Sequence, residues 1–479
     1  MRLGALIGDS AGTAADAPVT GLAIDHRKVA PGSIFGAFRG ARFNGEDYIA
    51  AAVASGAIAV VARPEATVSG AVHVADPNPR RAFAHIAAHF FDRFPATCVA
   101  VTGTNGKTST VELTRQLWNM AGHSAASIGT LGVTTGQDRV TTGLTTPDIV
   151  TFLANMSGLA TEGVTHAAFE ASSHGLDQYR TEGLRVAAGA FTNLSRDHLD
   201  YHGTMEAYLA AKLRLATEVV ADDGALVVWA DDPASHSFVA AAGARGLALT
   251  RVGATGEEIR INSRTPTHLG QILEIGGAFG DVRVELPLIG AYQAANALVA
   301  AGLVIATGGD PKATFAALGR VQPVPGRLER AAISRAGAPV YVDYAHTPDA
   351  IAAALDALRP HARGRLIVVI GAGGDRDQGK RPEMGKIAAE KAELVIVTDD
   401  NPRSEDPAAV RAAVLAGAPG ARDIGDRRDA IAAAIAAAGP DDIVCIAGKG
   451  HEQGQIVGAG EDLRVIPFDD VAVARECAA

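Results

Sequence analysis

A glycine-containing turn that carries a lysine and a threonine, Thr102-Gly-Thr-Asn-Gly-Lys-Thr108, has the composition of a phosphate-binding loop. It follows the apolar run Thr97-Cys-Val-Ala-Val101, so the pattern predicts a strand, a turn and the start of a helix. In such loops backbone N–H groups and the lysine bind phosphate, and the threonine hydroxyl ligates Mg²⁺. The usual first glycine is replaced by Val101, which indicates a shortened loop. We therefore predict ATP binding by Gly103, Thr104, Asn105, Gly106, Lys107, Thr108 and Ser109.

Three groups downstream of this loop could complete a magnesium and phosphate site. Glu170 ends an apolar run, His198 lies in a polar loop, and Lys212 falls on a predicted helix. A carboxylate at the carboxyl end of a parallel strand faces the nucleotide crevice, and Mg²⁺ prefers oxygen ligands, so histidine is the less usual ligand. The alternatives are an ordinary strand-to-helix turn, a strand-end glutamate, a loop histidine and a solvated lysine. The occurrence of Glu170, His198 and Lys212 together, downstream of a phosphate-binding loop, favours the magnesium and phosphate site over these alternatives.

The elements that must position these groups alternate between strand and helix, which predicts an α/β fold. The length of 479 residues suits three domains, predicted at 1–93, 94–328 and 329–479. We expect a central, mostly parallel sheet of the P-loop type, a small antiparallel annex at 257–287, and a C-terminal Rossmann-like domain. The predicted strands include 97–102, 166–170, 190–194, 225–230, 340–343, 365–370, 394–398 and 443–447, and the predicted helices include 78–94, 107–121, 205–217 and 429–438.

Composition limits the class of protein. The net charge of -10 argues against nucleic acid as a partner, because nucleic-acid-binding proteins usually carry a basic face. The 3 cysteines have no zinc-type spacing and are too few for a disulfide framework, which fits a reducing cytoplasm. No apolar run reaches the roughly 20 residues of a membrane-spanning helix, and the first residues do not resemble an export signal.

Five motifs in order resemble those of the Mur ligases, the cytoplasmic ATP-dependent amide ligases of peptidoglycan precursor synthesis. The resemblance spans nearly the whole chain. It implies a UDP-sugar domain, a central ATP domain and a C-terminal amino-acid domain, and we expect small-molecule substrates and a monomeric state. The motifs are Thr102-Gly-Thr-Asn-Gly-Lys-Thr108, Glu170-Ala-Ser-Ser-His174, Asn193-Leu-Ser-Arg-Asp-His-Leu-Asp200, Asp343-Tyr-Ala-His-Thr-Pro-Asp349 and Gly448-Lys-Gly-His-Glu452.

The resemblance also assigns roles to individual residues. It implies that Lys212 is carbamylated and ligates Mg²⁺ together with Thr108, Glu170 and His198. It places Asn296, Arg327 and Asp343 with ATP and His346 beside them, with His346 and Asp343 as candidate bases for the amine. The residues it places against a UDP-muramoyl dipeptide are Ile24, His26, Ala41, Arg42, Phe43, Thr145, Thr146, Ser172, Gln178 and Arg180.

The segment Asp400-Asn-Pro-Arg403 resembles the family's motif for recognition of meso-diaminopimelate. This acceptor carries a second carboxylate that lysine lacks, and an arginine guanidinium binds a carboxylate through two parallel hydrogen bonds. The sequence therefore predicts that Arg403 reads this carboxylate and that Glu452 suits the neighbouring ammonium. The predicted acceptor set is Arg376, Asp400, Asn401, Pro402, Arg403, Gly448 and Glu452.

Three positions depart from the family pattern: His26 replaces a common serine, and Leu144 and Gln293 replace common asparagines. The alternatives within the same fold are a ligase that uses L-lysine or another acceptor, and a folylpolyglutamate-type synthetase. A second class of alternative is a non-catalytic nucleotide-regulated binding protein descended from such ligases, and a third is a simple P-loop ATPase or kinase. Arg403 discriminates among the acceptors, and the presence of Lys107, Glu170, His198 and Lys212 argues against loss of catalysis.

Overall fold

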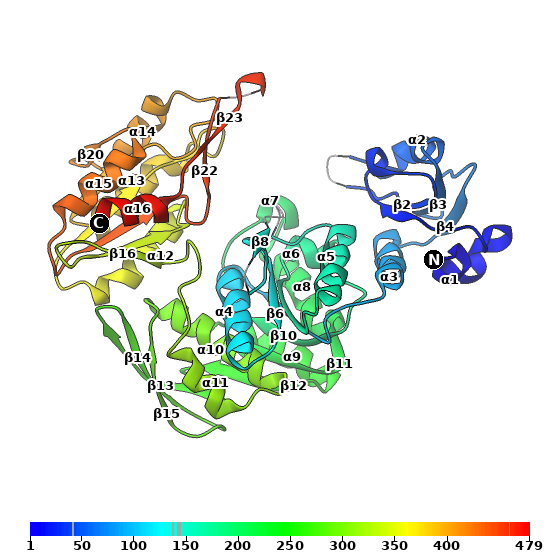
Figure 1. Cartoon of the computed structure of the whole chain (residues 1–479), viewed down its shortest axis with the longest axis horizontal. Helices are drawn as coiled ribbons and strands as arrows, with labels where there is room; N and C mark the ends of the chain where they lie inside the picture. Colours follow the sequence, from blue (N-terminus) through cyan, green and yellow to red (C-terminus); the bar gives the residue numbers. More distant parts are fainter. Residues whose placement is uncertain (41–42, 137, 141–144, 459) are drawn as a thin grey trace. The chain divides into compact units, whose positions relative to one another are not determined.

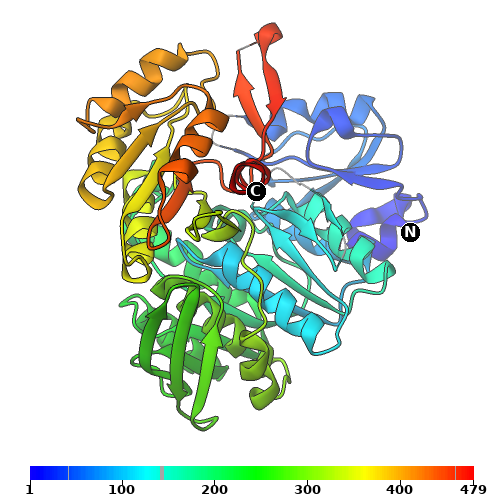
Figure 2. The same cartoon turned by 60° about the vertical axis from the view of Figure 1, so that its left-hand side comes forward.

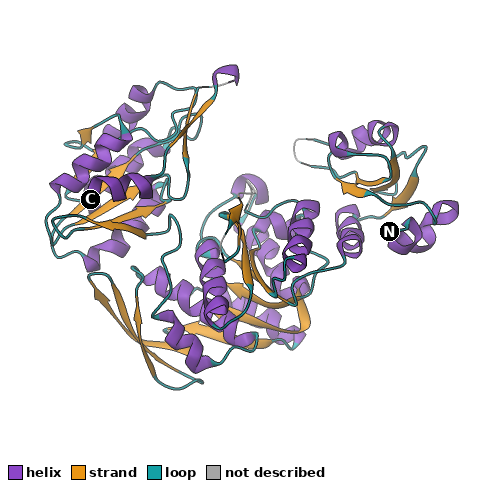
Figure 3. Ribbon diagram, viewed as in Figure 1, coloured by secondary structure: helices purple, strands orange, loops and turns teal. Residues whose placement is uncertain are grey.

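The computed structural model describes residues 1–40, 43–136, 138–140, 145–458 and 460–479. The chain divides by internal contacts into two compact units, one formed by residues 1–252 with 302–309 and the other by residues 253–301 with 310–479. Both units are α/β, with helices beside largely parallel sheets (Figure 1, Figure 3). The predicted fold class is confirmed, and the three domain boundaries stay predictions.

The first unit begins with a parallel sheet in the order β1-β2-β3-β4. Asn78 caps the helix that follows this sheet by accepting a hydrogen bond from the Arg81 N–H, and Pro79 occupies the first helical turn, where no backbone donor is needed. The elements of this part are β1 (Gly21–Ala23), β2 (Ser33–Gly36), β3 (Ala57–Ala62), β4 (Val72–Ala75), α1 (Leu3–Ile7), α2 (Ile49–Ala54) and α3 (Pro79–Phe91).

The rest of the first unit is a larger sheet in the order β12-β11-β10-β5-β9-β6-β7-β8. Pairing is parallel from β12 to β6 and antiparallel from β6 to β8. Its strands are β5 (Thr97–Thr102), β6 (Ala125–Gly129), β7 (Gly132–Thr134), β8 (Arg139–Val140), β9 (His166–Glu170), β10 (Val186–Phe191), β11 (Val220–Trp229) and β12 (Ala248–Gly253). Its helices are α4 (Lys107–Met120), α5 (Ile149–Thr161), α6 (Ser173–Asp177), α7 (Leu199–His202), α8 (Met205–Arg214) and α9 (Ser235–Arg245).

Strand register brings the predicted catalytic segments to one edge of this sheet. Val101 in β5 pairs with Glu170 in β9, and Thr102 pairs with Phe191 in β10. Because the three strands are parallel, the loops that follow them leave from the same edge. The apolar interior of the strands, which includes Val99 and Phe169, is fully buried and makes this edge rigid.

The second unit contains an antiparallel annex and a C-terminal sheet. The annex consists of β13 (Ile259–Thr267), β14 (Gly270–Gly276) and β15 (Val282–Leu286), as predicted. The C-terminal sheet has the order β16-β17-β21-β18-β19-β20, parallel except for β16. Its strands are β16 (Glu329–Ile333), β17 (Pro339–Asp343), β18 (Leu366–Ile370), β19 (Leu394–Val397), β20 (Arg422–Asp423) and β21 (Ile443–Ala447).

A separate hairpin, β22 (Gly454–Val457) and β23 (Arg464–Pro467), follows this sheet and projects from it (Figure 1, Figure 2). The exposed residues Val465 and Ile466 lie on its second strand. The helices of the unit are α10 (Ala291–Ala306, of which residues 291–301 count with this unit), α11 (Pro311–Leu318), α12 (Pro348–Leu358), α13 (Lys380–Lys391), α14 (Pro407–Leu415), α15 (Arg427–Ala437) and α16 (Asp470–Ala478).

Several predicted boundaries in the first unit were wrong: β10 begins at Val186 and not at 190, and the helix predicted to 94 is α3, which ends at Phe91. The strand predicted at 190–194 is β10, which ends at Phe191, because Thr192 and Asn193 turn their side chains to the phosphate loop. The helix predicted to 217 ends as an α-helix at Arg214 and continues as a π-helical segment, Leu215–Val219. The strand predicted at 225 begins at Val220. None of the described helices is both long enough and apolar enough to cross a membrane.

Candidate active site

The phosphate-loop motif adopts the predicted strand, turn and helix. β5 ends at Thr102 and α4 begins at Lys107, with Gly103 at φ 147° and Gly106 at φ 86°. A side chain at Gly103 would collide with the Thr192 hydroxyl and the Asn193 backbone. This position therefore requires glycine for space as well as for conformation.

The segment after β10 braces this loop. The Asn105 N–H donates to Asn193 Oδ1 (2.9 Å), and the Thr192 hydroxyl donates to the Asn105 carbonyl (2.6 Å). The Thr104 hydroxyl lies 3.2 Å from the Tyr208 hydroxyl, and it accepts from the Ser195 N–H at 3.0 Å. The predicted loop residues are therefore held by partners that lie about 90 positions away in the chain, as the 88-residue separation of Asn105 and Asn193 shows.

Lys107 and Lys212 converge on one carbonyl of the loop. Lys107 Nζ donates to the Gly103 carbonyl (3.0 Å) and the Thr104 carbonyl (2.9 Å), and Lys212 Nζ donates to the Gly103 carbonyl at 2.7 Å. Lys212 is only 1% exposed and lies over the Tyr208 ring, 4.3 Å from its centroid. Burial lowers the pKa of Lys212 well below its ordinary value, and the charge of Lys107 lowers it further. The amine of Lys212 is therefore readily deprotonated.

Glu170 is 2% exposed and is held by the turn after β6. Its Oε1 accepts from the Thr130 N–H at 2.7 Å, and Thr130 Oγ1 lies 3.1 Å from Thr145 Oγ1. A side chain at Gly129 would collide with the Glu170 carboxylate. Thr130 and Gly129 were not among the predicted site residues, although Gly129-Thr-Leu-Gly132 is a recognisable turn signal.

His198 lies in a group of aromatic and imidazole rings near Lys212. It has a left-handed backbone (φ 52°), and its ring centroid is 4.8 Å from that of His174 and 6.2 Å from that of Tyr208. Burial and the neighbouring imidazoles lower the pKa of His174 to about 4, so this ring is neutral at physiological pH. Within the described residues, no group of three or more His, Cys, Asp or Glu side chains could hold a metal ion by itself.

Four residues predicted to contact the UDP-muramoyl dipeptide form one hydrogen-bonded cluster. Arg180 donates to the Thr146 carbonyl (2.9 Å) and to Gln178 Oε1 (2.7 Å). The Thr146 hydroxyl donates to the Glu170 carbonyl (2.8 Å), while Ser172 caps α6 by accepting from the Gly175 N–H. Thr145 connects to the Glu170 carboxylate indirectly, through Thr130.

The other predicted sugar-nucleotide residues belong to the N-terminal sheet region. Ile24 follows β1, and the His26 ring stacks on Tyr48 with centroids 4.3 Å apart. Phe43 is 73% exposed, which is unusual for a phenylalanine and suits a ligand contact. Ala41 and Arg42, like the divergent Leu144, lie outside the described residues.

In the second unit, the predicted ATP-side residues are connected through Gln293. Its amide donates to the Arg327 carbonyl (2.8 Å) and accepts from Asn296 Nδ2 (3.1 Å). Gln293, which departs from the family pattern, therefore joins two predicted site residues. The Arg327 guanidinium lies 5.0 Å from the Tyr344 ring centroid.

Asp343 and His346 follow β17. Asp343 Oδ2 accepts from the Leu328 N–H at 2.7 Å, and burial raises the pKa of Asp343 to about 6 despite the nearby Arg327. Nδ1 of the exposed His346 lies 2.8 Å from the Tyr344 carbonyl, an acceptor, so Nδ1 carries the proton. In a neutral ring Nε2 is then the unprotonated nitrogen, which is available to accept a proton.

The predicted acceptor residues come together at the carboxyl ends of β18, β19 and β21. Asn401 Nδ2 donates to Glu452 Oε2 (2.9 Å), and Arg403 donates to the Gly374 carbonyl (2.8 Å). A side chain at Gly373 would meet Arg403 at 2.8 Å and Arg376 at 3.8 Å, so both guanidinium-bearing chains lie beside one glycine loop. A side chain at Gly448 (φ 120°) would meet Asp400 Oδ2 at 2.6 Å, so Asp400 lies against the backbone of Gly448.

Two further contacts hold the acceptor loop. Arg381, 3% exposed, donates two hydrogen bonds of 2.8 Å to Glu405, and these hydrogen bonds lower the pKa of Glu405 to about 2. The backbone of Arg403 pairs with the hairpin strand β22 through Ile456 and Gly458. These contacts were not predicted, because no local sequence pattern indicates them.

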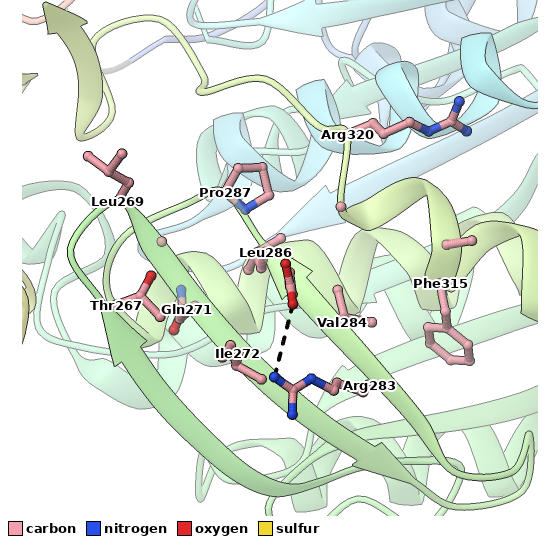
Figure 4. A pocket seen from close by; sticks show the side chains of 14 residues that line it. Thr267, Leu269, Gln271, Ile272, Arg283, Val284, Leu286, Pro287, Phe315 and Arg320 are labelled. Carbon is pink, nitrogen blue, oxygen red and sulfur yellow. Dashed lines mark ion pairs between the residues drawn. The ribbon is translucent and has the colours of Figure 1, made fainter. Parts of the chain in front are cut away.

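A cavity of about 590 Å³ lies elsewhere in the second unit, between β14, β15 and α11 (Figure 4). Arg283 and Glu285 form an ion pair at its wall. None of the predicted site residues lines it, so this cavity does not identify the active site. Its lining residues are Thr267, Leu269, Gly270, Gln271, Ile272, Arg283, Val284, Glu285, Leu286, Pro287, Phe315, Ala316, Gly319 and Arg320.

Comparison with known proteins connects these features. The profile described as "Mur ligase family, catalytic domain" matches residues 18–93, "Mur ligase middle domain" matches 101–304, and "Mur ligase, glutamate ligase domain" matches 326–450. The UDP-N-acetylmuramoyl-L-alanyl-D-glutamate--2,6-diaminopimelate ligase of Zymomonas mobilis is 61% identical over 461 residues, 96% of this chain and 95% of its own length. The protein of that name from Bradyrhizobium diazoefficiens is 53% identical over 98% of this chain and 97% of its own.

Solved structures agree with this relationship. A ligase structure of the same name superposes with a TM-score of 0.74 at 33% identity, covering 98% of this chain and 96% of its own. The MurF ligase of Thermotoga maritima in complex with ADP shares the fold, with a TM-score of 0.60, 21% identity and coverage of 90% of this chain and 94% of its own. The chain therefore belongs to the Mur ligase family, whose members are ATP-dependent ligases that form amide bonds.

Proposed function

We propose that the chain adds meso-diaminopimelate to the D-glutamyl residue of UDP-N-acetylmuramoyl-L-alanyl-D-glutamate, using ATP and an acyl-phosphate intermediate. The observation that carries the acceptor assignment is the cluster in which Arg403 lies beside Gly374 and Glu452 hydrogen-bonds Asn401. It presents a cation and an anion, which match the carboxylate and ammonium of the distal amino-acid head. The names of the relatives at 61% and 53% identity support the same assignment.

The chemistry begins with the transfer of the γ-phosphoryl group of ATP to the glutamyl carboxylate. A carboxylate is a poor electrophile, and phosphorylation gives it a phosphate leaving group. Both reactants are anions, so positioning and charge stabilisation are the main tasks of the protein. Lys107 and the loop N–H groups suit the phosphates, while the Arg180 cluster suits the dipeptide.

The acceptor amine then attacks the acyl phosphate, and the tetrahedral intermediate releases phosphate. The amine must lose a proton to attack. His346 is the stronger candidate base, because its Nδ1 contact leaves Nε2 unprotonated in the neutral ring. Asp343 is buried, and its carboxylate accepts the Leu328 N–H, which suits a positioning role.

Magnesium fits the donor chemistry of the loop edge if Lys212 is modified. The Glu170 carboxylate at the end of β9 and the Thr108 hydroxyl in the first turn of α4 are oxygen donors, and His198 would be a nitrogen donor. An ammonium at Lys212 would repel the ion, whereas a carbamate would supply oxygen ligands. When bound, the ion would offset phosphate charge. We further infer a cytoplasmic monomer, in keeping with cytoplasmic precursor synthesis.

We expect Lys212 to react with carbon dioxide, because its buried amine has a lowered pKa and the neutral amine is the nucleophile. Protein incubated with ¹³C-bicarbonate should give one carbamate carbon signal in NMR spectra, and Lys212→Ala should abolish it. Lys386→Ala, which removes an exposed lysine, should leave the signal unchanged. A spectrum without a carbamate signal in the native protein would contradict the modification.

The overall proposal is tested by phosphate release with the UDP-muramoyl dipeptide and a panel of amino acids. We expect meso-diaminopimelate to exceed L-lysine by about 100-fold or more in kcat/KM, since L-lysine lacks the distal carboxylate that would pair with the half-buried Arg403 guanidinium. Equal turnover with L-lysine would identify the alternative acceptor. Turnover of ATP without any acceptor would indicate a simple ATPase.

A further inference from the structure

We infer that Lys449 is a positioning residue that sets Asn401 and Glu452 to receive the distal ammonium of the acceptor. The inference rests on the proposed function, since it concerns recognition of that acceptor. Lys449 lies in the motif Gly448-Lys-Gly-His-Glu452 but has no role in the reaction described above. It follows β21, the strand that carries the motif to the edge of the C-terminal sheet.

Lys449 is fully buried, and its ammonium donates two hydrogen bonds and forms an ion pair with a third residue, Asp400. Nζ lies 3.0 Å from Asn401 Oδ1, 3.1 Å from Glu452 Oε2 and 3.6 Å from Asp400 Oδ1. A buried ammonium is stable only when such partners surround it. These three residues all belong to the set predicted to bind the amino acid. Lys449 therefore connects the segment that contains Asp400 and Asn401 with the segment that contains Glu452.

The contacts of Lys449 determine which way the Asn401 amide faces. Asn401 Oδ1 accepts from both Lys449 Nζ and the Ile456 N–H (2.9 Å). A flipped amide would direct its N–H groups at two donors, so this orientation is fixed by hydrogen bonding. Asn401 Nδ2 must then face Glu452 Oε2, at 2.9 Å, which in turn fixes the carboxylate.

Charge gives Lys449 a second effect on recognition. Asp400 and Glu452 each carry a negative charge, and Lys449 offsets one of them, which leaves a net negative charge suited to one ammonium. The neighbouring buried Arg427 also attracts Asp400 and Glu452 through its charge, but its side-chain hydrogen bonds of 2.7 Å go to Asp470, so it does not orient the two carboxylates as Lys449 does. Without Lys449, the two carboxylates would repel each other and the Asn401 amide would lose its fixed orientation.

The test compares meso-diaminopimelate with L-2-aminopimelate, which keeps the distal carboxylate but lacks the distal ammonium. The ratio of their kcat/KM values measures ammonium recognition alone. We expect Lys449→Met to lower this ratio at least tenfold through a higher KM for meso-diaminopimelate, with KM for ATP within twofold of wild type. Lys449→Gln, which retains an N–H donor, should lower the ratio less.

Arg365→Met is the matched control. It removes a cation that is paired with Asp442 (2.7 Å) beside the opposite end of β18, so any general loss of domain stability should leave the ratio unchanged. Equal losses for both acceptors in Lys449→Met would overturn the positioning role. A wild-type enzyme inactive with meso-diaminopimelate would instead refute the proposed function.

A crystal structure of the wild-type protein with meso-diaminopimelate keeps the inference testable if the variants do not fold. Lys449 Nζ should remain on Asn401 Oδ1 and Glu452 Oε2, without contact to the acceptor. Direct contact between Lys449 and the acceptor, or a reversed Asn401 amide, would overturn the inference.

Discussion

Replacement of Lys107 with alanine should lower the rate of ligation by about 1,000-fold. The change removes a positive charge at the point where negative charge accumulates during phosphoryl transfer, and preorganised charges of this kind contribute factors of about 10²–10³. It also removes the hydrogen bonds from Nζ to the Gly103 and Thr104 carbonyls, which hold the lysine over the loop. Phosphate release measured with all three substrates gives the rate.

The geometry of Lys107 predicts that arginine cannot replace it. A guanidinium is planar and larger than an ammonium, so Lys107→Arg should retain the charge but lose most of the activity, about 100-fold. Lys386→Ala, on α13, is the control and should keep activity within twofold because Lys386 is exposed. Phosphate release within tenfold of wild type in Lys107→Ala would contradict a catalytic role for the loop.

Replacement of Arg403 with alanine should remove acceptor selectivity. We expect kcat/KM for meso-diaminopimelate to fall about 100-fold to 1,000-fold, the scale of two charge-assisted hydrogen bonds. The value for L-lysine should change less than threefold, because L-lysine has no distal carboxylate. Arg403→Lys should give a smaller loss, about tenfold, since it keeps the charge without the paired donors.

Two observations separate recognition by Arg403 from support of its loop. The guanidinium also donates to the Gly374 carbonyl at 2.8 Å, so its loss could displace the glycine loop. Such a displacement would reduce turnover with both acceptors to the same extent, and this outcome would contradict the assigned role. Arg428→Ala, which removes an exposed guanidinium on α15, should affect neither acceptor.

Much of the fold was predictable because buried parallel strands are short apolar runs with clear ends. The predictions for β5, β9 and β21 agree with the structure at both ends. The prediction for β10 was wrong at both ends. Thr192 and Asn193 have side chains that a strand tolerates, yet they hydrogen-bond Asn105, which is 87 and 88 residues away. The local sequence pattern around Thr192 and Asn193 gives no indication of a hydrogen-bond partner that is so distant in the chain.

For the candidate site, the sequence indicated which residues to propose but not the contacts that these residues make with one another. Residue types and the family resemblance indicated Lys107, Glu170 and Arg403, which lie at the start of α4, at the end of β9 and in the segment after β19. They did not indicate that Lys449 is buried or that Gln293 connects Asn296 with Arg327. A lysine in a glycine-rich motif is usually assumed to reach solvent or substrate, and only the packing of β21 shows otherwise.

The pairing of Arg403 with β22 limits how acceptor preference can be transferred between enzymes. The Arg403 N–H donates to the Ile456 carbonyl (3.0 Å), and the Arg403 carbonyl accepts from the Gly458 N–H (2.8 Å). A chimera that exchanges only the loop around Arg403 could leave these backbone groups without partners, at a cost of about 1–3 kcal/mol each. The smallest exchangeable cassette is therefore discontinuous, and it includes the hairpin as well as the loop.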